Sequence, residues 1–119
     1  MDFSLTAEQQ AICDEVQKAC SPFDDDYWLE HDKTGEFPAD FHRAMAAGGW
    51  LGIAMPEEYG GAGLGATEAA LMMHAVANSS GAMSAASAIH INIFGPHPIV
   101  VFGSAEQKQR WLPGLIKGT

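Results

Sequence analysis

Basic side chains are scarce in this sequence of 119 residues, which has 6 Lys and Arg against 15 Asp and Glu and a net charge of −9. Binding to a nucleic-acid backbone requires clustered positive charge, and no such cluster is present. We therefore expect no nucleic-acid partner. The acidic excess instead predicts a well-solvated surface.

Long apolar runs are also lacking. No uninterrupted stretch approaches the ~20 apolar residues that a membrane-crossing helix needs, so we expect no membrane span. The first three residues, Met1-Asp2-Phe3, have neither the basic nor the apolar region of a secretory signal peptide. Together these absences predict a location in the bacterial cytoplasm or in an organelle matrix.

Cysteine is limited to two positions, Cys13 and Cys20. They are seven residues apart on one expected helix, which places their Cα atoms ~10 Å apart along its axis. This separation is too large for a disulfide within the helix, so we expect two free thiols. None of the five histidines has a two-histidine helical spacing with a third ligand, so we expect no metal site.

Signals for β-hairpins and for alternating helices and strands are absent, which predicts an all-α array of about six helices. Capping-box patterns, at Thr6 with Gln9 and at Ser104 with Gln107, mark the first and last helix starts. Thr67 is expected to cap the fourth helix. The expected helices cover residues 7–20, 22–31, 38–47, 68–78, 82–94 with a continuation to 102 after Gly95-Pro96, and 105–116.

Glycine is abundant in one stretch, residues 48–65, which reads GGWLGIAMPEEYGGAGLG. So much glycine excludes a helix interior. Large apolar or aromatic side chains in the same stretch need burial, which excludes a disordered linker. They include Trp50, Leu51, Ile53, Met55 and Tyr59. We therefore expect an ordered, packed connection between two helical layers, mostly coil, with a turn of helix at Glu57-Glu58.

Several strings in this order resemble the amino-terminal domain of the acyl-CoA dehydrogenase family. They are GWLG at residues 49–52 and PEEYGGAG at 56–63, preceded by LTAEQ at 5–9 and EFP at 36–38 and followed by GSAEQKQRWLPGL at 103–115. The resemblance covers essentially the whole chain. It implies one helical domain over residues 1–119, without the middle β-barrel and carboxy-terminal helical domains of the family.

The resemblance also implies a function for the complete protein. That protein would be an FAD-dependent acyl-CoA dehydrogenase, a homotetramer that removes hydrogen from the α and β carbons of acyl-CoA thioesters. A glutamate in the carboxy-terminal domain would remove the α-proton, and an electron-transfer flavoprotein would reoxidise the flavin. No catalytic residue and no cofactor-binding residue is expected in this chain, and Glu57, Glu58 and Glu68 are interpreted as acids of helical first turns.

Small residues dominate the first half of the helix expected at 82–94. Spacing alone favours a closely packed neighbouring helix over a thin apolar ligand. The resemblance instead implies that this helix forms one wall of the acyl pocket. The candidate substrate-binding residues, which fall at intervals suited to one helix face, are Ala86, Ser87, His90, Ile91 and Phe94.

Two alternatives remain open from the sequence. The first is an acyl-CoA oxidase or another flavoprotein of the same superfamily, which would share this domain. The second is a stand-alone helical domain that makes protein contacts and binds no flavin.

Overall fold

The computed structural model describes residues 1–119 as an all-α structure without strands, which confirms the predicted fold class. Seven α-helices are joined with two short 3-10 helices. The bounds are α1 Ala7–Cys20, α2 Asp25–Thr34, α3 Ala39–Ala47, η1 Trp50–Gly52, η2 Glu57–Tyr59, α4 Ala66–Ala77, α5 Ala82–Phe94, α6 His97–Phe102 and α7 Ala105–Lys117.

The helix starts are set mainly by local side-chain chemistry. In α1 the Thr6 hydroxyl accepts the Gln9 backbone N–H at 3.1 Å, and the Gln9 side-chain oxygen accepts the Thr6 N–H at 3.1 Å. Ser104 and Gln107 form the same reciprocal pair at the start of α7. Both predicted capping boxes are therefore confirmed.

Two expected starts are wrong. The second helix begins at Asp25 instead of Pro22, because the Asp24 carboxylate accepts the Tyr27 N–H at 3.0 Å and fixes the cap there. The fourth helix begins at Ala66, so Thr67 lies inside its first turn instead of capping it. The reason is Glu68, whose carboxylate accepts the N–H of Gly65 at 3.1 Å and closes the turn from the other side.

The glycine-rich stretch is ordered and packed, as predicted. Leu51, Ile53 and Met55 are buried. Three backbone bonds close the stretch on itself, from the N–H groups of Ala62, Gly63 and Leu64 to carbonyls on the other limb. The two limbs approach each other most closely at Gly61, where an added Cβ would lie 2.1 Å from the Met55 carbonyl oxygen. Only glycine fits there.

The buried residues form two separate clusters. The larger one has fifteen members and lies among α1, α2, α3, α4, α5 and the start of the glycine-rich stretch, with Phe41, Met72 and Ile89 fully buried. The smaller one consists of Met55, Leu112 and Ile116, and it fixes α7 onto the glycine-rich stretch. Each cluster therefore secures a different part of the chain.

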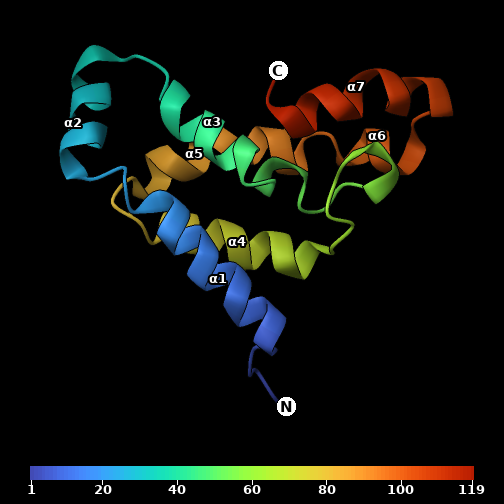
Figure 1. Cartoon of the computed structure of the whole chain (residues 1–119), viewed down its shortest axis with the longest axis horizontal. Helices are drawn as coiled ribbons and strands as arrows, with labels where there is room; N and C mark the ends of the chain where they lie inside the picture. The colour runs from blue at the N-terminus through green and yellow to red at the C-terminus, as the bar shows by residue number, and fades with distance from the viewer.

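The molecule is flat, with extents of 43, 40 and 20 Å. Its thinnest dimension is about two helix diameters, which corresponds to two layers. Helix α1 packs against α4, and α4 packs against α5, while α7 contacts η1 and η2 (Figure 1). The amino terminus lies at the outer end of α1, and the carboxy terminus lies beside α3.

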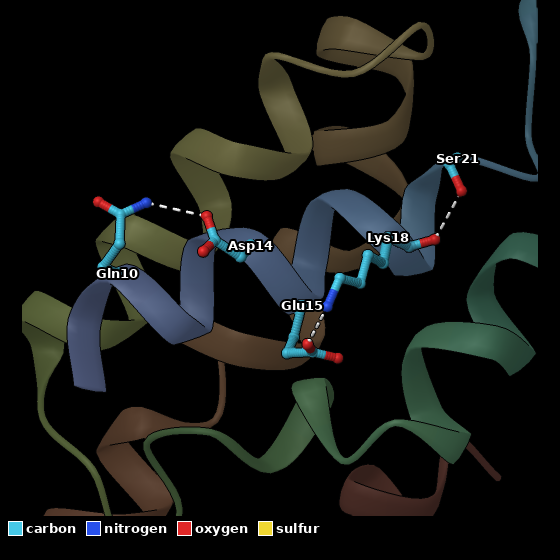
Figure 2. Close-up of polar contacts among 5 residues, drawn as sticks. All are labelled: Gln10, Asp14, Glu15, Lys18 and Ser21. Atoms are coloured by element: carbon cyan, nitrogen blue, oxygen red, sulfur yellow. Dashed lines mark hydrogen bonds and ion pairs between the residues drawn. The ribbon is translucent and has the colours of Figure 1, made fainter. Parts of the chain in front are cut away.

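The outer face of α1 carries polar side chains that bond to one another and to the backbone. Gln10 donates to Asp14 at 2.9 Å, Lys18 pairs with Glu15 at 2.6 Å, and the Ser21 hydroxyl donates to a backbone carbonyl (Figure 2). The Glu15 carboxylate raises the pKa of Lys18. Because these groups are solvated, α1 contributes to the core through its opposite face.

Helices α5 and α6 carry much of the exposed apolar surface. Their large exposed side chains are Met83, Ile91, Phe94, Val101 and Phe102. The helical run Ala82–Phe102 is 21 residues long and has a mean hydropathy of 1.3, so by length and composition alone it is able to cross a membrane. The expectation that no apolar stretch approaches the length of a membrane-crossing helix is therefore wrong for this run. The reason is that Gly95 keeps a helical backbone conformation, so α5 and α6 follow one another with only a slight interruption. Core helices of soluble proteins meet the same criterion.

Candidate functional site

A groove of about 430 Å³ runs between α4 and α5. Its volume lies within the ~300–1,000 Å³ that is usual for small-molecule sites. The two helices are antiparallel neighbours in the chain, joined by the short turn at residues 78–81 (Figure 1). The lining residues are Ala70, Met73, His74 and Ala77 from α4, and Met83, Ala86, Ser87, His90 and Phe94 from α5.

Small side chains open this groove. Ala70 and Ala77 on one wall and Ala86 and Ser87 on the other leave space above the line where the helices touch. Below that line, larger side chains of the same helices, such as Met72 and Ile89, are fully buried in the main cluster. The seam is therefore tightly packed on its core side and hollow on its outer side.

Four of the five predicted wall residues line this groove, namely Ala86, Ser87, His90 and Phe94. Ile91 is not among the lining residues and is 67 % exposed. Successive residues of a helix are turned by about 100°, so Ile91 lies about 40° beyond Ser87 around the helix axis. Ile91 is therefore outside the groove lining, and the role of all five residues in substrate binding stays a prediction.

The α4 wall was missed by sequence reasoning. Ala70, Met73, His74 and Ala77 have the spacing i, i+3, i+4, i+7 of one helix face, so the signal was available. The adjacent stripe of α4 faces the core, and its residues Met72, Ala75 and Val76 are buried. When a helix has a second row of apolar residues beside the row that faces the core, it is expected to pack on two sides. In α4 this second row lines the groove.

The groove surface is almost wholly apolar, and its ionisable groups are two histidines. The Nδ1 atom of His90 lies 3.1 Å from the Ser87 carbonyl oxygen, which favours the tautomer in which Nδ1 carries the proton. The Nε2 atom is then left as an acceptor. His74 lies in the last turn of α4 on the other wall. No carboxylate lines the groove, so its chemistry is suited to holding an apolar group.

The three glutamates interpreted as first-turn acids lie outside the groove. Glu57 and Glu58 are in η2. Glu68 is in the first turn of α4 and accepts a hydrogen bond from the side-chain amide of Gln9 at 3.0 Å. This bond from Gln9 is the main reason why the pKa of Glu68 is lowered. Glu68 thus joins the starts of α1 and α4, which is a structural role.

Comparison with known proteins gives one matching family model. The model described as acyl-CoA dehydrogenase, N-terminal domain, matches residues 6–119. A probable acyl-CoA dehydrogenase, YngJ of Bacillus subtilis (strain 168), is 37 % identical over 124 aligned residues, covering 100 % of this chain and 31 % of the relative. The acryloyl-CoA reductase (NADH) of Anaerotignum propionicum is 34 % identical and covers 99 % of this chain and 29 % of the relative.

Solved structures give the same match in three dimensions. A chain from a study of the electron transferring flavoprotein of Acidaminococcus fermentans superposes with a TM-score of 0.88 at 32 % identity, over 100 % of this chain and 31 % of that chain. PigA with FAD and proline superposes with a TM-score of 0.86 at 27 % identity, over 99 % of this chain and 31 % of that chain. The chain thus spans less than a third of the length of these proteins.

Proposed function

This chain belongs to the acyl-CoA dehydrogenase family as its N-terminal domain, and we propose from this that it forms part of an FAD-dependent enzyme acting on the α and β carbons of acyl-CoA thioesters. The observation that carries the proposal is the family match over residues 6–119, which includes both helices of the apolar groove. The flavin-binding and proton-removing parts are proposed to lie in other domains of the complete protein.

The contribution of this chain is one side of the acyl-binding site. The groove between α4 and α5 has the volume and the apolar lining that a hydrocarbon chain requires. Burial of each methylene group in such a groove is worth about 0.8 kcal/mol. Ala86, Ser87, His90 and Phe94 would contact the chain from α5, and Met73 would contact it from α4. Ile91 is exposed beside the groove and is suited to contact a neighbouring domain.

The residues of this chain do not fit FAD itself. The pyrophosphate and the ribityl hydroxyls of that cofactor need polar donors, but the groove is almost wholly apolar and no buried side chain in the chain is polar. One of the polar cavities, beside the start of α2, is lined by Asp24, Asp25, Asp26 and Ser80, and its carboxylates repel phosphate. The flavin is therefore proposed to be held by other domains of the complete protein.

Other features of the complete protein follow from the family as proposals. The electron acceptor would be an electron-transfer flavoprotein, the assembly a homotetramer, and the location the bacterial cytoplasm or an organelle matrix. The exposed apolar side chains of α5 and α6 fit a domain that is covered by other parts of a larger protein.

A second candidate function is the reduction of an α,β-unsaturated acyl-CoA, the reverse of the same change at the same two carbons. The observation that favours it is the similarity to the acryloyl-CoA reductase of Anaerotignum propionicum, at 34 % identity compared with 37 % for the probable dehydrogenase. These identities do not separate the two directions. Both directions require the same apolar groove for the acyl chain.

The test uses the complete protein that carries this chain, purified with FAD. It is assayed with saturated acyl-CoA thioesters and an electron acceptor, and in the reverse direction with unsaturated thioesters and a reductant. We expect Ser87→Phe, which fills the groove, to lower kcat/KM about ten-fold or more, because overfilling an apolar site costs about 1–3 kcal/mol.

The matched control is Ser84→Phe on the same helix, since Ser84 is exposed and lies outside the groove. It should leave kcat/KM within about two-fold of the wild-type value, because surface substitutions usually change little. Absence of turnover in both directions would refute the proposed activity. Equal losses in Ser84→Phe and Ser87→Phe would remove the groove from the acyl site.

A further inference from the structure

The turn between α4 and α5, residues 78–81, joins the two walls of the groove. The lining residues nearest to it are Ala77 on one wall and Met83 on the other. The turn is held by its own bonds: the N–H and the hydroxyl of Ser79 both donate to the Val76 carbonyl, and the Ala82 N–H donates to the Ser79 carbonyl at 3.0 Å. Any shift of this turn therefore moves the ends of both walls.

The backbone is strained where the turn enters α5. Ala82 has a φ of +43°, and it is the one residue other than glycine with a positive φ. Residues with a Cβ atom avoid this left-handed region for steric reasons. Ala82 is exposed, so burial of its side chain does not compensate the strain. Such strain persists where the surrounding structure over-determines the conformation. A contact from outside the turn is therefore needed to hold it.

The ring of Trp28 supplies this contact. Helix α2 lies at the end of the molecule where α4 turns into α5, and Gly81 of the turn is buried against the ring (Figure 1). A Cβ added at Gly81 would lie 2.6 Å from the Cζ2 atom of Trp28. The ring is itself fixed, because its Nε1–H donates to the Phe23 carbonyl at 3.1 Å and it stands edge-to-face with Phe41, with 5.0 Å between the ring centroids. Trp28 thus connects the turn to the core.

Helix α2 joins the fold chiefly through this one side chain. Trp28 is its single buried residue, and the next apolar residue, Leu29, is half exposed. The acids of its first turn, Asp25 and Asp26, are exposed. The packing of α2 is therefore directed at the α4–α5 turn, at the closed end of the groove.

We infer that Trp28 is a positioning residue for the acyl groove, which holds the α4–α5 turn so that the two walls keep the separation an acyl chain needs. This inference rests on the proposed function, because the acyl chain is the occupant. Trp28 does not line the groove and acts through Gly81 and Ala82. Without its ring, Ala82 relaxes to an ordinary φ, and the open arrangement becomes one of several. A site that is open for a fraction of the time binds its ligand more weakly by that fraction.

The test compares Trp28→Leu with the wild type in the complete protein with FAD, using butanoyl-CoA and dodecanoyl-CoA. If the open arrangement falls to about a tenth, KM for dodecanoyl-CoA should rise about ten-fold while kcat stays within about two-fold. KM for butanoyl-CoA should stay within about two-fold, because a short chain makes few contacts in the groove. Trp28→Phe keeps a ring and should show a smaller rise with the same dependence on chain length, so it carries the test if Trp28→Leu does not fold.

Two further variants separate positioning from general destabilisation. Leu112 is fully buried in the smaller cluster, away from the turn, so Leu112→Ala should lower the melting temperature and leave both KM values unchanged. Glycine adopts a positive φ without strain. Ala82→Gly added to Trp28→Leu should therefore bring KM for dodecanoyl-CoA back toward the wild-type value.

The outcomes separate this inference from the proposed function. If the wild type turns over acyl-CoA but Trp28→Leu leaves KM for dodecanoyl-CoA unchanged, or raises both KM values alike, the inference is overturned and the acyl site stands. An equal rise in Leu112→Ala, or no recovery with Ala82→Gly, also overturns it, because KM would then follow stability alone. If the wild type turns over no acyl-CoA, the proposed function fails, and the inference fails with it.

Discussion

Replacing Gly61 with alanine tests the close approach at the centre of the glycine-rich stretch. An added Cβ would lie 2.1 Å from the Met55 carbonyl oxygen and 2.8 Å from the Met55 Cβ. Backbone atoms cannot move aside as a flexible side-chain end can. The two limbs of the stretch must therefore separate, and Met55 must shift from its place against Leu112 and Ile116.

The expected cost follows from what the separation breaks. The Met55 carbonyl accepts the Gly63 N–H at 2.8 Å, and the Gly52 carbonyl accepts the Ala62 N–H at 2.9 Å. Each such bond contributes about 1 kcal/mol net. Partial exposure of the Met55 side chain, which is 2 % exposed in the wild type, adds about 1–2 kcal/mol. The lower chain entropy of alanine in the unfolded state offsets about 0.4–1 kcal/mol.

We therefore expect Gly61→Ala to lower the free energy of unfolding by about 2–4 kcal/mol. Urea denaturation followed by circular dichroism measures this, and a slope of about 1–3 kcal/mol per molar urea converts it to a midpoint shift of about 1 M or more. The matched control is Gly114→Ala inside α7, where the nearest atom to an added Cβ is 3.5 Å away. That variant should be stabilised by up to about 1 kcal/mol, because glycine is unfavourable in a helix interior.

Equal midpoints for Gly61→Ala and the wild type would show that the two limbs do not approach as described. The assignment of the stretch as a packed connection would then fail. If Gly114→Ala lowered the free energy of unfolding by a similar amount, adding a methyl group at a glycine would be destabilising even where there is space for it. The effect of Gly61→Ala would then not be evidence for the close approach of the two limbs.

Two other predictions concern single side chains. Because the Gln9 amide holds the pKa of Glu68 below its ordinary value of 4.5, the folded state gains stability from this carboxylate above that pH and loses it as the pH falls through the lowered value. Glu68→Gln should therefore be less stable than the wild type in thermal melts at neutral pH, with a difference that shrinks in acid; a constant difference would contradict the linkage. Burial raises the pKa of the Cys20 thiol, with a smaller opposing effect from Ser79, while Cys13 is partly exposed. Mass-spectrometric mapping should find Cys13 alkylated well before Cys20, and equal rates would mean that Cys20 is not buried at the end of α1.

Features that depend on neighbours in sequence were predictable. The capping boxes at Thr6 and Ser104 require only two side chains three residues apart, and both helix starts were found. The start of α4 was missed because two local signals compete. Thr67 has the side chain of a cap, but the Glu68 carboxylate reaches back to Gly65 and decides the outcome.

Half of the candidate site was also predictable. The α5 wall follows from the resemblance, whereas the α4 wall depends on the pairing of two helices, which spacing within one helix does not reveal. Intervals along one helix also do not reveal which residues of a broad face line a groove. Ile91 lies at the edge of the predicted face, and the structure leaves it 67 % exposed and outside the groove lining.

The separation of the two buried clusters affects how the chain opens. Helix α7 is attached through three buried side chains, while the rest of the fold shares fifteen. Segments with few buried contacts open at lower free energy than the body of a domain. Helix α7 is therefore expected to detach first in brief native-state excursions. Each such excursion uncovers Met55 and with it one limb of the glycine-rich stretch.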